Sequence, residues 1–287
     1  MHKSFYHRML SLLSALLALT LSLGAAAPAL AEASPRREGV YEVIESLYDD
    51  AYEQYMNDGG ERFDKLLSFH DALAASPALH FRAYGNNPAE VIERDIPDEC
   101  LVNFGTEYAS ESRFEYEGEA LTETEAIQVS EGYFDLFPIE IAEGRVFESA
   151  DYDYSGAGVV PVILGSAYRP AFEIGDTFEA YYIFERFAFE VIGFAQPGGE
   201  FYLRAENRPA DFDRYIVMPF PKIKADSAFG RRALLAEVSG FIAPDGTRDE
   251  AREICFGLMK DAGLEDWTKF FFINEQDLMS KLGASGH

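Results

Sequence analysis

The sequence predicts an α+β fold in which a β-rich segment interrupts a unit built from both ends of the chain. Three observations lead to this prediction. Over residues 38–76 the apolar side chains recur at three- and four-residue steps, which is the period of helices. Residues 136–214 hold apolar and aromatic runs that are typical of buried strands. From residue 215 the pattern becomes strand, helix, strand, so the chain returns to a mixed arrangement.

The segment 1–31 is predicted to be a signal peptide or a membrane anchor. Lys3 and Arg8 give it a basic start, a run rich in leucine and alanine follows, and Ala29 and Ala31 are small residues of the kind that signal peptidase recognises. The alternative is an anchor, because about 20 apolar residues suffice to cross a bilayer. Both alternatives place the remaining chain outside the cytoplasm, either secreted or held at the cell membrane.

Residues 38–76 are predicted to form a pair of helices. The first runs from Glu38 to Met56 and is ended by the glycine pair that follows it. The second ends before Pro77, because proline cannot continue a helix. The apolar face of the first helix comprises Val40, Val43, Ile44, Leu47, Ala51, Tyr52 and Tyr55.

The next two parts of the chain, 78–135 and 136–214, are predicted to be mainly strands. In the first we expect a short helix at 89–94, an exposed loop or hairpin at 107–124, and strands at 79–83, 100–105 and 125–130. In the second we expect a short helix capped by Ser166 and buried strands at 159–164, 177–184 and 187–195. Strands that are apolar on both faces are typical of a small barrel or sandwich.

The last part, 215–276, is predicted to hold strands at 215–218, 234–243 and 269–273. Between the second and third of these, a helix over 247–262 has an apolar face of regular spacing, and Gly263 ends it.

The negative charge of the chain argues against nucleic acid as a partner, and the absence of nucleotide-binding motifs argues against a bound nucleotide. The chain carries 50 acidic residues against 24 lysines and arginines, a net charge of −26. Phosphate backbones repel such a surface, so we expect no nucleic acid. Neither GxGxxG nor GxxxxGK[ST] occurs, so we expect no directly bound nucleotide. The acidic surface serves either solubility or an affinity for cationic peptides.

The motif search predicts no catalytic residue, no cofactor and no metal. HExxH, CxxC and GxSxG are all absent, and beyond the leader the only histidines are His70, His80 and His287. The run Asp151–Gly156 begins like a calcium loop, but its twelfth position is Val162 instead of glutamate. The alternative of another class is an exported acid/base hydrolase with paired carboxylates, resembling a glycosidase. Glu190 is its best candidate, although strand alternation points Glu190 outward.

The only two cysteines, Cys100 and Cys255, leave two possibilities open. In an oxidising compartment they can pair, because both are expected to face a core. Otherwise they remain as two buried free thiols.

Six fragments then occur in a fixed order along the chain. They are Ser130 with Tyr133-Phe134; Gly144-Arg145-Val146-Phe147 with Asp151; Val160 to Leu164; Phe172 with Ile174-Gly175-Asp176; Phe189 to Phe194; and Tyr215 to Pro219. Together they resemble the periplasmic core domain of MacB-type ABC-transporter permeases, a family with FtsX- and LolC-like relatives. We expect eight of these residues to form a structural signature: Tyr133, Phe134, Gly144, Arg145, Phe147, Gly175, Gly193 and Pro219.

The resemblance implies a porter-like α+β subdomain made of 78–135 and 215–276, with 136–214 inserted as a small barrel-like subdomain. It also implies a non-enzymatic role in envelope transport or sensing, for example in export of, or resistance to, peptides, antimicrobials or lipoproteins. The partners implied are a separate permease and a cytoplasmic ATPase. The chain departs from the family because the later transmembrane helices are missing. A truncated permease remnant is therefore a further alternative.

Overall fold

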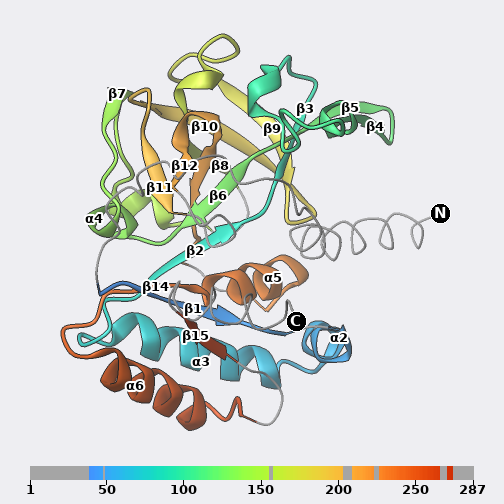
Figure 1. Ribbon diagram of the computed structural model, residues 1–287. Coiled ribbons are helices and arrows are strands. Elements are labelled where there is room, and N and C mark those ends of the chain that lie inside the picture. Colours follow the sequence, from blue (N-terminus) through green and yellow to red (C-terminus); the bar gives the residue numbers. More distant parts are fainter. Residues whose placement is uncertain are drawn as a thin grey trace, which may run out of the picture. The chain divides into compact units, whose positions relative to one another are not determined.

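The computed structural model describes residues 39–47, 49–154, 158–202, 209–222, 226–265 and 270–273. The predicted signal or anchor segment 1–31 lies outside these residues. Within them, no helix is both long enough and apolar enough to span a membrane. The longer helices lie near the two ends of the chain and the middle is rich in strands, so the predicted α+β class is confirmed (Figure 1).

Thirteen strands form one curled sheet, in which twelve follow one another and β7 (Ile141–Gly144) pairs with β10. The order is β15 (Phe270–Ile273), β1 (Tyr41–Glu45), β14 (Gly240–Ile242), β2 (Arg82–Asn86), β6 (Ala126–Val129), β13 (Ile216–Pro219), β8 (Val159–Leu164), β10 (Glu185–Ala195), β9 (Thr177–Tyr182), β3 (Ala89–Ile92), β5 (Glu119–Thr124) and β4 (Arg113–Tyr116). A separate ribbon pairs β11 (Glu200–Tyr202) with β12 (Pro209–Asp211).

Four helices build one core with the first strands of this order. They are α2 (Asp49–Asn57), α3 (Glu61–Ala75), α5 (Ala228–Glu237) and α6 (Arg248–Asp261). Val43, Ala83 and Ile242 face this helical core, whereas Tyr84 and Phe241, their neighbours on β2 and β14, face a second core that contains α4 (Tyr133–Leu136). Because side chains alternate along a strand, this part of the sheet is covered on both faces.

The β-rich part curls around a core of its own. Strands β3, β6, β8, β9, β10 and β13 all send apolar side chains into it, with Phe178, Phe189 and Phe194 among the largest. This barrel-like core agrees with the predicted β-rich character of 136–214. It also draws in β3, β6 and β13 from outside that range, so the boundaries of the inserted subdomain stay a prediction.

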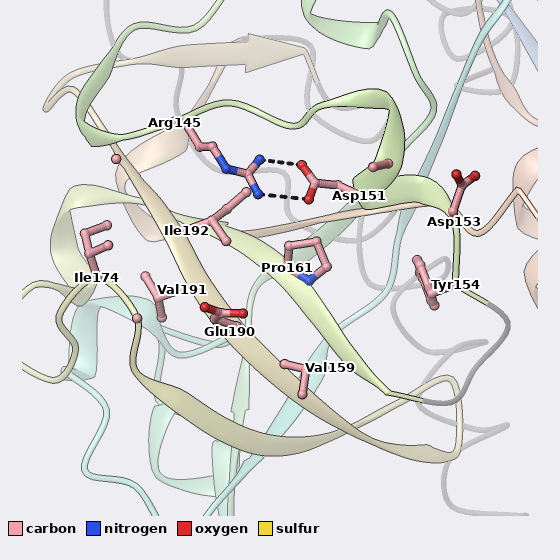
Figure 2. Close-up of a pocket in the computed structure, with 13 residues that line it drawn as sticks. Arg145, Asp151, Asp153, Tyr154, Val159, Pro161, Ile174, Glu190, Val191 and Ile192 are labelled. Carbon is pink, nitrogen blue, oxygen red and sulfur yellow. Dashed lines mark hydrogen bonds and ion pairs between the residues drawn. The ribbon is translucent and has the colours of Figure 1, made fainter.

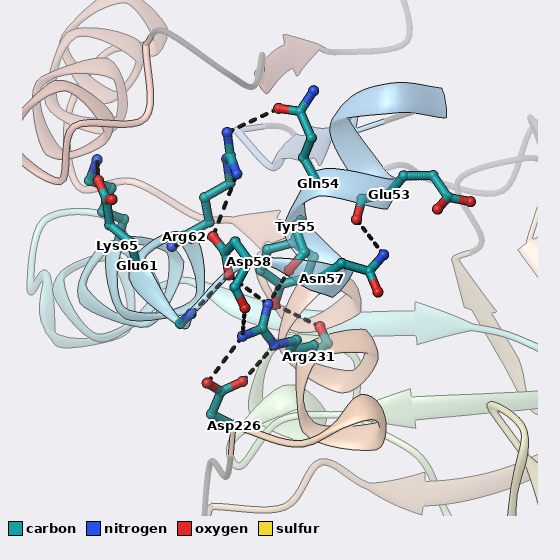
Figure 3. Close-up of polar contacts among 11 residues, drawn as sticks. Glu53, Gln54, Tyr55, Asn57, Asp58, Glu61, Arg62, Lys65, Asp226 and Arg231 are labelled. Carbon is teal, nitrogen blue, oxygen red and sulfur yellow. Dashed lines mark hydrogen bonds and ion pairs between the residues drawn. The ribbon is translucent and has the colours of Figure 1, made fainter.

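One buried arginine holds helices α2 and α5 together (Figure 3). The guanidinium of Arg231 pairs with Asp58 at 2.7 Å and with Asp226 at 2.5 Å, and it also donates to the carbonyl oxygen of Tyr55. The Tyr55 hydroxyl in turn donates to the Arg231 carbonyl at 2.8 Å. A buried charge of this kind is stable only when its partners neutralise it, so these contacts fix how the two helices meet.

The first half of the predicted helix 38–56 is wrong. Residues 41–45 form strand β1, and α2 begins only at Asp49. Val43 lies opposite Gly240 of β14 on one edge and Phe272 of β15 on the other. Pairing on both edges outweighs the helical spacing of the apolar residues, and β-branched residues favour strands.

Two predictions between residues 78 and 135 are also wrong, and the strand expected at 79–83 lies instead at Arg82–Asn86, as β2. Residues 89–92 form strand β3 instead of a short helix, because β5 and β9 pair with its two edges. The strand expected at 100–105 is instead the end of a 3-10 helix, η1 (Asp98–Cys100), followed by turns. The predicted loop or hairpin at 107–124 is a hairpin, made by β4 and β5.

The predicted strand 234–243 is wrong in its first half. Helix α5 extends to Glu237, and only Gly240–Ile242 form strand β14. The Ser227 side chain caps this helix by accepting a hydrogen bond from the amide of Gly230 at 3.0 Å. A short apolar run fits a buried helix as well as a strand, so its periodicity alone does not decide between them.

The short helix expected to be capped by Ser166 is instead a 3-10 helix, η4 (Ser166–Tyr168), and no side chain of the described residues caps it. The remaining predictions for the second half of the chain are confirmed in outline. Strand β8 has the predicted bounds, β9 and β10 form the expected pair, and β15 covers 270–273. Helix α6 begins after its N-cap Thr247, which forms a capping box with Glu250.

The structure does not bring Cys100 and Cys255 together. Both thiols are free and buried, Cys100 in the β-rich core and Cys255 in the helical core. Each cysteine was expected to face a core, and each does, but the two cores differ. The possible disulfide is therefore not formed.

Candidate functional site

The larger cavity, of about 620 Å³, opens on the outer face of β8 and β10. We call it the Glu190 groove. Residues 144–154 form one wall, and the turn at Ile174 and Gly175 forms another (Figure 2). The outward side chains of β8 contribute Val159 and Pro161, while Val160 and Val162 point into the core. Strand alternation thus explains which residues the groove exposes.

Two glycines allow the wall to approach β10 closely. Gly144 has a φ of +81°, and a Cβ atom there would lie 2.2 Å from the carbonyl oxygen of Ile192. Gly193 lies opposite Gly144, and a Cβ atom on it would lie 2.5 Å from the carbonyl oxygen of Arg145. Both positions therefore require glycine. The register of β10 against β8 also shifts between Val191 and Gly193, which marks a β-bulge beside the groove.

An ion pair holds the same wall in shape. Arg145 donates to both carboxylate oxygens of Asp151, at 2.5 and 3.0 Å, and Asp151 also accepts from the amide of Glu148 at 2.7 Å. Partial burial acts to raise the pKa of Asp151, but these hydrogen bonds hold it below its ordinary value. The Asp151 hydrogen bonds are the main cause that raises the pKa of Arg145, and the charge of Glu190 adds to it.

The opposite wall is tied to β10 by backbone hydrogen bonds. Gly175 has a φ of +85°, and its amide donates to the carbonyl oxygen of Val191 at 2.8 Å. The amide of Val191 donates to the carbonyl oxygen of Asp176 at 2.9 Å. These bonds hold Ile174 at the rim, where it remains 40% exposed.

Glu190 points out of the sheet, as strand alternation predicts. Its neighbours Phe189 and Val191 are buried, while Glu190 is exposed and lies opposite Pro161 of β8. Figure 2 shows its carboxylate apart from the Arg145–Asp151 pair. Within the described part of the chain, Glu190 has no ion pair, whereas Asp153 has Lys222 at 3.8 Å.

The remaining signature residues lie beside the groove wall. Phe134 stacks on Phe147 with ring centroids 6.1 Å apart, and the buried Tyr133 meets Phe134 edge-on at 5.7 Å. The carbonyl oxygen of Pro219 accepts hydrogen bonds from Tyr154 at 2.6 Å and from Gln128 at 3.3 Å. The structure thus brings Gly144, Arg145, Gly175 and Gly193 to the groove and places the others behind it. Their structural role stays a prediction.

Sequence reasoning missed the apolar rim of the groove. Val159 and Ile174 are both at least 40% exposed and line the groove. The sequence contains one weak signal for each exposed residue. Val159 is the first outward residue of a predicted strand, and Ile174 stands beside the glycine of a predicted turn. Neither position predicts exposure without knowledge of the neighbouring walls.

The metal predictions can be compared only in part with the structure. Residues 155 and 156, the last two of the calcium-like run 151–156, lie outside the described residues. Among the described residues, no group of three or more His, Cys, Asp or Glu side chains could hold a metal ion. The carboxylate of Asp151 is engaged by Arg145.

The second cavity, of about 240 Å³, lies between α3, β2 and residues 220–222. His70 Nδ1 lies 3.0 Å from Asp71 Oδ1 and its Nε2 lies 3.4 Å from Glu237 Oε1. Lys222 pairs with Glu131 at 3.0 Å. Charged groups here are engaged with one another, so the Glu190 groove is the better candidate for binding a partner.

The comparison with known proteins gives two kinds of match. The family model described as MacB-like periplasmic core domain matches residues 15–254. No match was found among curated proteins.

Among solved structures, the chain is similar to the periplasmic region of MacB from Actinobacillus actinomycetemcomitans. The two are 15% identical with a TM-score of 0.47, and the match covers 86% of this chain and 93% of that one. It is also similar to the extracellular domain of the noncanonic ABC-type transporter YknZ from Gram-positive bacteria. This second match has 13% identity and a TM-score of 0.42, and covers 82% and 100% of the two chains.

The family model spans most of the chain, including every element that surrounds the groove. The ordered fragments that suggested the resemblance lie within the same span. The chain therefore belongs to the MacB-like periplasmic core domain family.

Proposed function

We propose that this chain is an extracytoplasmic, non-enzymatic domain that acts through protein–protein contacts in envelope transport or sensing. The family match over residues 15–254 is the observation that carries the proposal. The proposed partners are an ABC-transporter permease and its ATPase, and the cargo class is a peptide, an antimicrobial or a lipoprotein. The predicted signal or anchor segment supports an extracytoplasmic location.

The groove supports a binding role better than catalysis. Paired-acid hydrolysis requires two carboxyl groups that flank a substrate, one of them protonated at working pH. In the groove, Asp151 is held ionised by Arg145, while Glu190 is open to solvent. The glycines that shape the groove bring backbone segments together, as a structural joint does.

Site-specific photocrosslinking tests this function. A photoreactive amino acid is introduced at exposed positions on separate faces, such as Phe104, Ile174 and Ile254, in the cell that makes the protein. We expect at least one position to crosslink to an ABC-transporter permease, identified by mass spectrometry. Absence of such a crosslink from every face would contradict the proposal.

The hydrolase alternative makes the opposite prediction and needs its own assay. The purified chain is incubated with a panel of chromogenic glycosides, with Glu190→Gln as the matched variant. We expect no turnover by either protein. Turnover that the variant loses would favour the hydrolase, and would contradict the non-enzymatic role.

The remnant alternative is tested by the DNA around the gene. Intact permease and ATPase genes beside it would favour partnership. In-frame transmembrane segments beyond a stop codon would favour a truncated permease.

A further inference from the structure

The Glu190 groove has a charge and an apolar surface that are not used inside the molecule. Three acidic residues line it, Asp151, Asp153 and Glu190, against one basic residue, Arg145, so its lining carries 3 − 1 = 2 net negative charges. Arg145 is neutralised by Asp151 through two hydrogen bonds. The carboxylate of Glu190 therefore faces the groove without an ion pair among the described residues, although its charge also acts on Arg145.

The rim of the groove is apolar and exposed. Val159 is 49% exposed and Ile174 is 40% exposed, and both line the groove. Scattered exposed apolar residues are common on protein surfaces, but these two line the same concave acidic site and form an apolar patch there. Such a combination suits a ligand that presents a cation beside an aliphatic side chain.

The walls are also pre-shaped. Gly144 and Gly193 set the distance between one wall and β10, and the Gly175 amide fixes the other wall to Val191. A rigid groove loses little conformational entropy when a ligand binds. The volume of the groove, about 620 Å³, is large enough to hold a few residues of an extended chain.

We propose that the Glu190 groove binds an extended basic segment of a partner protein. In this segment a lysine or arginine meets Glu190, and an aliphatic side chain two residues along, on the same face of the extended chain, packs between Val159 and Ile174. The inference rests on the proposed function and deepens it, because it states the chemistry of the partner. The overall charge of −26 helps to attract such a partner from a distance.

The test uses a fluorescent peptide that repeats lysine–serine–valine–serine, here called the lysine–valine peptide, so that lysine and valine lie on the same face of the extended chain. It is added to the whole chain and followed by fluorescence anisotropy. The matched controls are a glutamate–valine peptide, in which glutamate replaces every lysine, and a peptide in which serine replaces every valine. We expect the lysine–valine peptide to bind most tightly. Its affinity should fall as ionic strength rises, because the charges remain partly exposed.

Variants in the groove locate the binding. Glu190→Gln and Ile174→Ser should each weaken the lysine–valine peptide by about tenfold, the effect of losing one well-placed contact. Their matched controls are Glu115→Gln on β4 and Ile254→Ser on α6, which are also exposed and lie away from the groove. These controls should leave the affinity unchanged. Glu190→Lys should reverse the preference toward the glutamate–valine peptide.

Four results would overturn the inference. One is no preference for the lysine–valine peptide; another is equal weakening by the groove and control variants. The third is a dimer in sedimentation velocity that Glu190→Gln dissociates, which would make a second copy of this chain the occupant. Crosslinks to a permease from Phe104 or Ile254, but never from Ile174, would overturn the inference and leave the proposed function standing.

Discussion

At the scale of single residues, glycines and half-buried acids are the positions where sequence has the strongest consequence. Gly144 combines a positive φ with backbone contact on its Cβ side, so two separate physical reasons demand glycine. Gly118 in the β4–β5 hairpin has a similar φ of +88°, but nothing lies within 4 Å of its Cβ position. Substitution at Gly118 therefore causes backbone strain alone, whereas substitution at Gly144 causes the same strain and a steric clash.

Gly144→Ala should therefore destabilise the protein more than Gly118→Ala does. We expect about 1 kcal/mol for Gly118→Ala, from strain alone. Gly144→Ala should cost about 3 kcal/mol, since the wall must also move away from Ile192. Urea unfolding of both variants measures the difference. Equal losses would show that the backbone contact at Gly144 relaxes without cost.

Glu90 predicts a dependence of stability on pH. It lies opposite Glu123 in the β3–β5 ladder and opposite Tyr181 in the β3–β9 ladder. Burial, and then repulsion from Glu123, raises the pKa of Glu90 to about 8. An acid whose pKa is raised by folding favours the native state while it is protonated. Stability should therefore fall as pH rises from about 5 to about 8.

Glu90→Gln should flatten this profile and raise the melting temperature more at pH 8 than at pH 5. Differential scanning fluorimetry across this range is the measurement, with Glu115→Gln as the exposed control on β4, which is separated from β3 by β5. An unchanged slope in Glu90→Gln would show that Glu90 remains ionised throughout.

At the scale of elements, α2 and α5 depend on Arg231 for their contact. The side chain is 7% exposed, so removal of its charge takes the nearest cation from Asp58 and Asp226, and Asp58 keeps its longer pair with Arg62 at 3.6 Å. By contrast, Lys65 and Glu61 form an exposed pair one turn apart on α3. Buried and exposed pairs of this kind differ widely in their contribution to stability.

We expect Arg231→Met to reduce the free energy of unfolding by about 3 kcal/mol. Lys65→Met, the exposed control, should reduce it by less than about 0.5 kcal/mol. Guanidinium unfolding followed by circular dichroism measures both. A small loss in Arg231→Met would mean that the two helices are held by apolar packing instead.

The elements predicted correctly from sequence carried their own local signals. Thr247 and Glu250 mark the start of α6 by a capping box, and the apolar run of β8 is bounded by a glycine on each side. Among the elements predicted wrongly, α5 holds a short apolar run that fits a helix or a strand, whereas β1 depended on partners distant in sequence. Strand β1 exists because β14 and β15, about 200 residues away in the chain, pair with its edges.

The sequence predicted some residues of the candidate site but not how they come together. Gly144, Arg145 and Gly193 were identified from their order, and the structure places them together. Spacing could not reveal that Gly144 lies opposite Gly193, or that Ile174 stays exposed, because both depend on how separate turns meet β10. The outward direction of Glu190, in contrast, followed from alternation along one strand.

At the scale of the whole molecule, the two cysteines lie in separate hydrophobic cores, so their reactivity tests whether these cores stay apart. Burial raises the pKa of each thiol to about 12, and each lies in a different core. A thiol in this state reacts slowly, because the thiolate is the nucleophile.

Thiol titration of the native protein at pH 8 should therefore proceed slowly for both cysteines. In non-reducing denaturant we expect two rapidly reacting thiols per chain. Fewer than two, with recovery after reduction, would show that Cys100 and Cys255 form a disulfide.

Strand β2 joins the helical part of the sheet to the β-rich part. It has two residue pairs with β14 on one edge and three with β6 on the other. Sliding one part past the other would break these hydrogen bonds together, whereas flexing about the axis of β2 leaves each bond nearly intact. We therefore expect the two parts of the sheet to move relative to each other mainly by twisting about the axis of β2. A load applied at the Glu190 groove, carried through β8, β13 and β6, would reach the helices as a rotation.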